Sequence, residues 1–452
     1  MITGDKRDRK KKMKNSNLIF VLKYISIIIF LLIVFHSEDS KAQFAYGADV
    51  SWLSQMEDSG YVFKDNKGIQ KDCLEILKGK GINALRFRVW VNPAEGYCNK
   101  KDVAYMAGRA KSLGFNVMID FHMSDSWADP GNQTKPAAWA NHSLSQLQTD
   151  VYDHVHGVLD TLKSIGVTPK WVQIGNETND GMLWEDGKAF KSMSNFASLI
   201  KSGYSAVKAI DTTIQVIVHL SNGYDNSMYR WIFDGLKNNG AKWDIIGMSV
   251  YPYLSGYTWI QYNGSAQINM GDLVNRYNTK VMVCEAGYPY NQPDESNKYL
   301  TDLIAKTQAF GGLGVFYWEP ECYNWQNYGL GAWDPVTEEP TTAMDAFLTA
   351  SAVVKQENTI PANYDIKIYP NPFNPSTTIQ FSMLKAGNIS LHIYDSLGRL
   401  VKSLVSEYKG AGKYSVRWDG MDDNGRQCSS GVYLVNMQTD SHLEARKMIL
   451  LR

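Results

Sequence analysis

The sequence has no excess of either charge, few cysteines and no glycine-rich phosphate loop. Its 452 residues carry 46 Lys and Arg against 46 Asp and Glu, which gives no argument for binding nucleic acid or an anionic membrane. The five cysteines include no closely spaced pair of the kind that binds zinc. No Gly-x-Gly-x-x-Gly follows the first predicted strand, which argues against a nucleotide cofactor. We expect a monomer with no nucleic-acid partner, no metal and no cofactor.

The N-terminus contains one apolar run that is long enough to serve as a signal peptide or a membrane anchor. A cluster of Lys and Arg precedes the run Leu18–Phe35, which Lys23 interrupts, and small residues around Ala42 offer a cleavage site. This pattern predicts a signal peptide over residues 1–42, with Met13 as an alternative start, and a secreted or cell-surface protein. An uncleaved membrane anchor is the alternative. No later segment is apolar enough to span a membrane, so the mature chain is expected to have none.

From about residue 43 to residue 350, strand-like apolar runs alternate with amphipathic helical stretches. Alternation of this kind predicts a parallel sheet, and eight such units in one domain fit a (β/α)₈ TIM barrel better than an open doubly wound sheet. The expected strands are Tyr46–Val50, Ala84–Val89, Asn116–Phe121, Trp171–Gly175, Gln215–His219, Ile245–Val250, Lys280–Cys284 and Gly314–Tyr317.

The chain changes character after the predicted barrel. Residues 351–364 are polar and aperiodic, as expected for a linker. Residues 365–452 then show short alternating segments separated by turn residues, which predicts a small β-sandwich. Its expected strands are Ile366–Tyr369, Thr377–Phe381, Ile389–Tyr394, Lys413–Trp418 and Val432–Met437.

Two of the barrel strands end at glutamates. Glu177 follows Trp171–Gly175, and Glu285 follows Lys280–Cys284. The carboxyl ends of barrel strands form the active-site face of the fold. A pair of carboxylates at that face can hydrolyse a glycosidic bond, one protonating the leaving oxygen and the other attacking or activating water. The alternative is that either glutamate is an ordinary charge at a strand end.

Two arginines alternate with apolar residues in the second strand. Arg86 and Arg88 therefore share one side of the strand, and one of them could reach a carboxylate in the cleft. Such a pair would favour the ionised carboxylate and lower its pKa, as a nucleophile requires. The alternative is a structural ion pair inside the barrel.

Other polar and aromatic residues gather at the predicted strand ends. A tryptophan can stack on a sugar ring, Asn176 could bind a sugar 2-hydroxyl, and a tyrosine hydroxyl could orient Glu285. A metal site of His122, Asp125 and Asp129 is an alternative use of the segment after the third strand. The predicted substrate-binding residues are Asp49, Arg88, His122, Ser124, Asp125, Trp127, Asn176, His219, Tyr251 and Trp318.

Five segments together resemble the arabinogalactan endo-β-1,4-galactanases of glycoside hydrolase family 53. The resemblance implies a retaining mechanism with Glu177 as acid/base and Glu285 as nucleophile, acting inside β-1,4-galactan chains of pectin. Met123 stands where the family usually has an aromatic residue, and Ala286–Asn297 lacks the ligands of the calcium loop found in some bacterial members. The segments are Gly47–Ser51, Arg86–Trp90, Ser124–Pro130, Gly175–Glu177 and Gly181–Trp184.

The C-terminal segment resembles the sorting domains of the type IX secretion system. The resemblance rests on Tyr369–Pro375, Tyr394–Arg399, Gly431–Tyr433 and Lys447–Leu450. It implies export across an outer membrane, with secretion machinery as the partner of this domain. A passive β-sandwich or a carbohydrate-binding module is the alternative.

Two other functions compete with an endo-galactanase. The same carboxylate pair would serve a barrel glycosidase that acts on another β-1,4-glycan, such as a cellulase or a mannanase. A non-catalytic carbohydrate-binding protein on an inactive barrel is a rival of a different class. The presence of both Glu177 and Glu285 argues against this second rival.

Overall fold

The structure is a computed structural model of the chain that describes residues 43–348, 364–384, 387–410, 412–439 and 442–451. The predicted signal peptide over residues 1–42 lies outside the described residues, as does the predicted linker apart from residue 364. Among the residues that are described, no helix is both long and apolar enough to cross a membrane.

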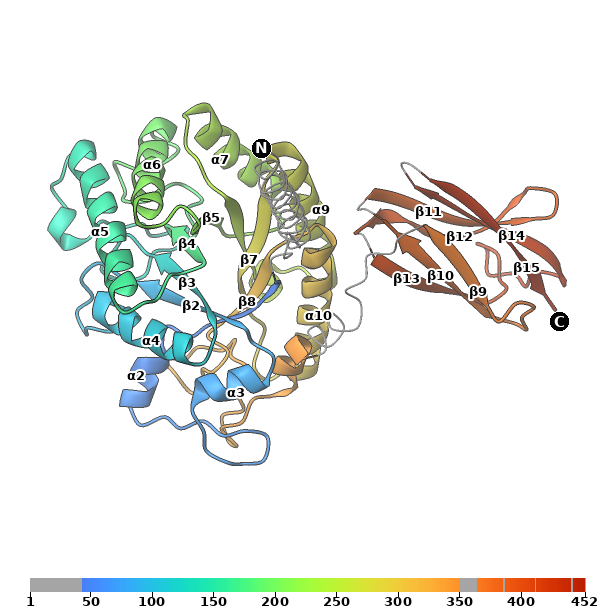
Figure 1. Cartoon of the computed structure of the whole chain (residues 1–452), viewed down its shortest axis with the longest axis horizontal. Helices are drawn as coiled ribbons and strands as arrows, with labels where there is room; N and C mark the ends of the chain where they lie inside the picture. The colour runs from blue at the N-terminus through green and yellow to red at the C-terminus, as the bar shows by residue number, and fades with distance from the viewer. Residues whose placement is uncertain (1–42, 349–363, 385–386, 411, 440–441, 452) are drawn as a thin grey trace, which may run out of the picture. The chain divides into compact units, whose positions relative to one another are not determined.

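Eight parallel strands form a closed barrel in sequence order, which confirms the predicted fold class (Figure 1). The barrel closes where β1 pairs with β8, with Ala45 opposite Gly314. The strands are β1 Ala45–Asp49, β2 Ala84–Val89, β3 Asn116–Phe121, β4 Trp171–Ile174, β5 Gln215–Leu220, β6 Ile245–Val250, β7 Lys280–Ala286 and β8 Gly314–Trp318.

Helices follow the strands and surround the barrel (Figure 1). Their apolar faces explain their positions: along α5, for example, Leu147, Val151, Val155 and Leu162 are all buried. The α-helices are α2 Leu53–Asp58, α3 Cys73–Gly79, α4 Lys100–Ser112, α5 Leu144–Ser164, α6 Met193–Ile210, α7 Asn226–Asn238, α8 Pro252–Ser255, α9 Trp259–Tyr277 and α10 Pro293–Ala309. Short 3₁₀ helices cover Ala137–Trp139 and Thr342–Met344.

A register shift interrupts the pairing of β6 with β7. Met248 pairs with Val283, but the next residue, Ser249, pairs with Glu285, so Cys284 is an extra residue in β7. A bulge of this kind re-aims the side chains that follow it. Cys284 packs with the apolar residues inside the barrel, and Glu285 also reaches an interior partner, Arg86. The strand extends to Ala286, two residues beyond its predicted end, and Ala286 still pairs with Val250 of β6.

The C-terminal segment forms two antiparallel sheets, ordered β13-β10-β9 and β12-β11-β14-β15. Buried residues from both sheets, such as Ile379, Leu391 and Trp418, make one apolar cluster, so the sheets pack face to face as a sandwich. Two of the strands were not predicted, β12 and β15, because most of their residues are exposed or half-buried and break the alternation. The strands are β9 Asp365–Tyr369, β10 Thr377–Met383, β11 Gly387–Asp395, β12 Leu400–Lys409, β13 Gly412–Trp418, β14 Gly431–Thr439 and β15 Leu443–Leu450.

All five cysteines are free thiols. The Cys98 thiol lies 3.4 Å from a guanidinium nitrogen of Arg88 and 3.4 Å from the carbonyl oxygen of Ser51. Burial raises the pKa of this thiol to about 11, which keeps it protonated.

The barrel and the sandwich have separate apolar cores, because no buried cluster combines described residues of both. We therefore expect a protein of residues 43–350 to fold and to keep the thermal midpoint of the barrel transition in the full chain. Differential scanning calorimetry of both proteins measures this. Aggregation of the shorter protein, or a barrel transition that is lowered by more than about 5 °C, would show that the C-terminal segment stabilises the barrel.

Candidate active site

The guanidinium of Arg86 lies at the centre of the polar network inside the barrel mouth. It is 2.6 Å from Asp49, 2.8 Å from Asp120 and 2.9 Å from Glu285, and its side chain has no exposed surface. These three carboxylates come from β1, β3 and β7, so one cation connects three separate strands. Although burial disfavours its charge, Arg86 and a neighbouring histidine hold the pKa of Asp120 at about 2.

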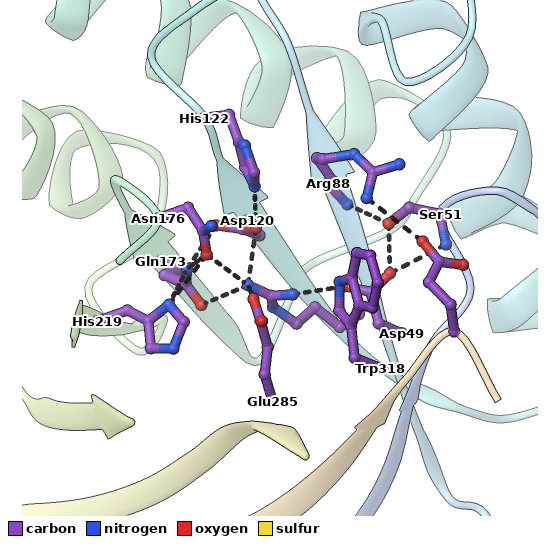
Figure 2. A network of polar contacts seen from close by, with 12 residues as sticks. Asp49, Ser51, Arg88, Asp120, His122, Gln173, Asn176, His219, Glu285 and Trp318 are labelled. Atoms are coloured by element: carbon purple, nitrogen blue, oxygen red, sulfur yellow. Dashed lines mark hydrogen bonds and ion pairs between the residues drawn. The ribbon is translucent and has the colours of Figure 1, made fainter. Parts of the chain in front are cut away.

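Two amide side chains also contact a terminal nitrogen of Arg86. Gln173 Oε1 accepts from its guanidinium at 3.2 Å, and Asn176 Oδ1 accepts at 3.1 Å. Figure 2 shows Asp120, Gln173, Asn176 and His219 close to Glu285. The side-chain nitrogen of Asn176 donates to the backbone of Ala128, which fixes the amide orientation. The predicted contact of Asn176 with a sugar would use its remaining exposed surface, which is 6%.

Arg88 has a different position from the one predicted for it. Its guanidinium stacks on the Trp127 ring at 4.1 Å and on the Trp90 ring at 4.7 Å, and it lies 3.3 Å from Glu319. Its exposed surface is 1%, so in this structure it supports the tryptophans and does not face a substrate. The ion pair with Glu285 belongs to Arg86, the arginine that the sequence-based list of site residues omitted.

Glu177 lies in the loop directly after β4, in a left-handed backbone conformation with φ of 45°. Such a conformation is strained for a residue with a side chain and is common at functional sites. The Ser249 hydroxyl is 2.6 Å from Glu177 Oε1. Burial raises the pKa of Glu177 to about 7, and the bond from Ser249 opposes this shift. The carboxyl group is therefore protonated over the acidic range, as an acid catalyst must be.

Glu285 is 6% exposed and has a partner on each oxygen. Oε1 lies 2.9 Å from Arg86, and Oε2 accepts from the Tyr251 hydroxyl at 3.2 Å. The predicted role of Tyr251 in orienting Glu285 agrees with this contact. Arg86 lowers the pKa of Glu285, as predicted, but burial outweighs this effect and the net shift is upward. Burial raises the pKa of Glu285 above its ordinary value, and the charge of Glu177 adds to this shift.

The two glutamates titrate as a pair that holds a proton near neutral pH. Glu285 has a guanidinium and a phenol as donors, whereas Glu177 receives the hydroxyl of Ser249. The state with the charge on Glu285 and the proton on Glu177 is therefore the stable singly protonated state. This is the distribution that a nucleophile and an acid catalyst require.

Three tryptophans lie at the same strand ends as this pair, Trp52 after β1, Trp127 after β3 and Trp318 at the end of β8. The ring of Trp318, at the end of β8, lies 5.1 Å from Trp52 and 5.9 Å from Trp127. Trp127 and Trp318 keep exposed surface, as stacking on a sugar would need. Trp52 was not predicted, because it follows β1 as a single aromatic residue with no pattern around it.

Several predicted substrate-binding residues are buried behind the cleft surface. Asp49 and His219 have no exposed surface, and His122 and Ser124 have 2%. The prediction that these four residues contact the substrate directly is therefore wrong. They support the residues around them instead. Asp125 is half-buried, but its two oxygens accept from the backbone N–H groups of Asn92 and Ala137, so it braces the loop.

The predicted alternative of a metal site at His122, Asp125 and Asp129 does not form. Both ring nitrogens of His122 have partners, since Nε2 lies 2.9 Å from Asp120 and Nδ1 accepts from Ala128 N–H. Within the described part of the chain, the group with ligand-like spacing is Glu319, Glu321 and Cys322, which is fully buried. Glu319 is already paired with Arg88.

Three residues of the network are absent from the predicted site residues: Asp120, Gln173 and Ser249. All three are buried polar residues within apolar strands or at their ends. That pattern is the signal that could have found them, because buried polar groups need partners.

Comparisons with known proteins agree with this geometry. The family model of glycosyl hydrolase family 53 matches residues 45–298, and that of the FlgD Ig-like domain matches residues 375–442. A relative from Neosartorya fischeri, named "Probable arabinogalactan endo-beta-1,4-galactanase A", is 34% identical over 342 residues, which are 69% of this chain and 92% of the relative.

Two solved structures share the barrel. The GH53 catalytic domain of Ignisphaera aggregans is 30% identical with a TM-score of 0.62, covering 68% of this chain and 96% of that one. A structure described as one of two fungal β-1,4-galactanases is 26% identical with a TM-score of 0.63, covering 68% of this chain and 99% of that one. With the carboxylate pair at the mouth of its barrel, the chain belongs to glycosyl hydrolase family 53 and is a glycoside hydrolase.

Proposed function

We propose that the protein is an exported, retaining endo-β-1,4-galactanase that cleaves inside the galactan chains of pectic arabinogalactan. The observation that carries the proposal is the unequal environment of the two glutamates. Arg86 and Tyr251 contact Glu285, and the hydroxyl of Ser249 contacts Glu177. The names of the relatives support galactan as the substrate.

The geometry supports a mechanism in two steps. In the first, the Glu285 carboxylate attacks the anomeric carbon while the Glu177 carboxyl group protonates the departing glycosidic oxygen, which leaves a galactosyl-enzyme ester. In the second, ionised Glu177 takes a proton from water, and the water oxygen displaces Glu285. Arg86 and the Tyr251 hydroxyl keep Glu285 ionised and oriented for the first step. Two inversions return the original anomeric configuration.

Export rests on two segments of the sequence. The basic, apolar and small-residue order of residues 1–42 is typical of a signal peptide. Residues 365–452 contain segments that resemble those of sorting domains, and a compact antiparallel sandwich is a suitable form for such a domain. The partner of this domain would be the secretion machinery, and the mature enzyme would lie outside the cell or on its surface.

A reporter fused to residues 365–452 behind a signal peptide tests the sorting function. In a bacterium that has a type IX secretion system, we expect the reporter in the medium or on the cell surface. A matched fusion without residues 365–452 should stay in the periplasm. Equal distribution of the two fusions would show that the sandwich is not a sorting signal, whatever the activity of the barrel.

The substrate is tested by incubating the purified protein with linear β-1,4-galactan, cellulose and β-1,4-mannan. We expect reducing ends to appear about tenfold faster or more from galactan, because hydrogen bonds to one hydroxyl configuration reject another. Product sizing should show internal cleavage. Faster release from cellulose or mannan would assign the alternative glycosidase. Binding to galactan without turnover on any of the three would identify a carbohydrate-binding protein.

Substitution of each glutamate tests the two roles. Glu285→Ala should reduce turnover at least roughly 10³-fold, and azide should restore it with a product of inverted configuration. Glu177→Ala should keep a fast first step on substrates with good leaving groups, since these need little protonation, and azide should give a product of retained configuration. NMR of the anomeric products measures both outcomes.

The matched control is Glu75→Ala, which removes an exposed glutamate from α3 and should keep wild-type turnover. Exchange of the two stereochemical results would reverse the roles of Glu177 and Glu285. Wild-type turnover in either variant would overturn the assignment of that residue.

A further inference from the structure

A chain of buried polar groups extends from Glu177 into the barrel. Ser249 Oγ lies 2.6 Å from Glu177 Oε1 and 2.9 Å from His219 Nε2. On the other side of the ring, Gln173 Nε2 is 2.9 Å from His219 Nδ1. Ser249 is 1% exposed, and His219 and Gln173 are fully buried, so the partners along this chain are protein groups. The direction of each hydrogen bond can therefore be worked out from its neighbours.

The donors and acceptors along this chain can be assigned by starting at His219 Nδ1. The backbone N–H of Glu177 donates to Nδ1 at 3.4 Å, and the peptide plane fixes where that N–H points. The amide of Gln173 is also fixed, because its Oε1 accepts from Arg86 and its Nε2 donates to Asp120 at 2.6 Å. Nδ1 thus faces two donors and must carry the lone pair of the ring.

The opposite tautomer would need Nδ1 to donate to Asn176 Oδ1, which lies 3.0 Å away. That oxygen already accepts from Arg86 at 3.1 Å. A proton on Nδ1 would also leave the backbone N–H of Glu177 and the second hydrogen of the Gln173 amide pointing at a donor. Burial and the charge of Arg86 hold the pKa of His219 well below its ordinary value, so the ring is neutral. Its one proton is on Nε2.

We infer that His219 and Ser249 are positioning residues that direct the catalytic proton to one oxygen of Glu177. His219 Nε2–H donates to Ser249 Oγ, and the Ser249 O–H then donates to Glu177 Oε1. Because Oε1 accepts a hydrogen bond, the acidic proton of Glu177 is on Oε2. The same oxygen gives this proton to the leaving group and takes one from water in the second step. The inference rests on the proposed hydrolytic function.

Titration of Glu177 depends on groups from several elements. Since its pKa is about 7, we expect wild-type kcat/KM on galactan to fall as the pH rises above 7 and the acid loses its proton. The charged and titratable groups that influence Glu177 or are influenced by it are Arg86 on β2, Asp120 on β3, Asp129 in the following loop, His219 on β5, Tyr229 on α7, Tyr251 after β6, Tyr262 on α9 and Glu285 on β7.

Ser249→Ala removes the donor to Oε1 and lets the proton occupy either oxygen. We expect kcat/KM on galactan to fall roughly 10- to 100-fold, part of the ~10²–10⁴-fold that general acid catalysis contributes. The loss should be small on an aryl galactobioside with a good leaving group. The alkaline limb should move to higher pH, because the lost bond favoured the ionised carboxylate. Ser249→Thr, which keeps a hydroxyl, should restore the wild-type profile.

The control is Ser296→Ala, which removes a buried hydroxyl from α10 and should change neither the pH profile nor the leaving-group dependence. A merely structural role for Ser249 would lower activity equally on both substrates at every pH. That result would overturn the inference, provided that Ser249→Ala shows a cooperative thermal unfolding transition and is therefore folded.

NMR of ¹⁵N-histidine-labelled protein tests the tautomer without any measurement of activity. The chain has eight histidines, and His219→Gln identifies the signal of interest by its loss. We expect a neutral ring protonated at Nε2 from pH 5 to pH 8. A ring protonated at Nδ1 would reverse the direction of the chain and contradict the inference even in an active galactanase. An inactive protein with the Nε2–H tautomer would instead show that the proposed function had failed.

Discussion

The ion cluster around Arg86 is the interaction on which the active site depends. A guanidinium without exposed surface is stable only if its charge is compensated, and here carboxylates from β1, β3 and β7 compensate it through its two terminal nitrogens. Removing one partner from a buried pair of this kind typically costs roughly 3–5 kcal/mol, because the remaining charge stays buried. The same contacts therefore connect the strands and set the charge of Glu285.

One cation among three carboxylates leaves a surplus of negative charge in a site that water scarcely reaches. Burial raises the pKa of both Glu177 and Glu285, and the charge of each disfavours the charge of the other. The surplus is relieved by one retained proton, and the positions of Arg86 and Tyr251 decide which glutamate keeps it. The asymmetry between acid and nucleophile thus follows from the different partners of two identical side chains.

Much of the barrel and both glutamates could be predicted from the sequence. Buried parallel strands are continuous apolar runs, and a glutamate directly after such a run is easy to see, as for Glu177. The bulge at Cys284 could not be predicted, because it depends on pairing with β6. The sequence could not show which of Arg86 and Arg88 pairs with Glu285, because both face the same side of β2. The answer depends on residues that are distant in sequence. Exposed strands such as β12 gave no alternation to detect.

The central claim is that Glu285 is ionised by its partners and acts as the nucleophile. Trapping with an activated 2-deoxy-2-fluoro galactobioside tests it directly, because a retaining enzyme forms a covalent ester that turns over slowly with such a compound. Proteolysis and mass spectrometry then locate the sugar. The account predicts one glycosyl group, on the peptide that contains Glu285 and on that carboxylate. An adduct on Glu177, or turnover with inversion and no adduct, would contradict it.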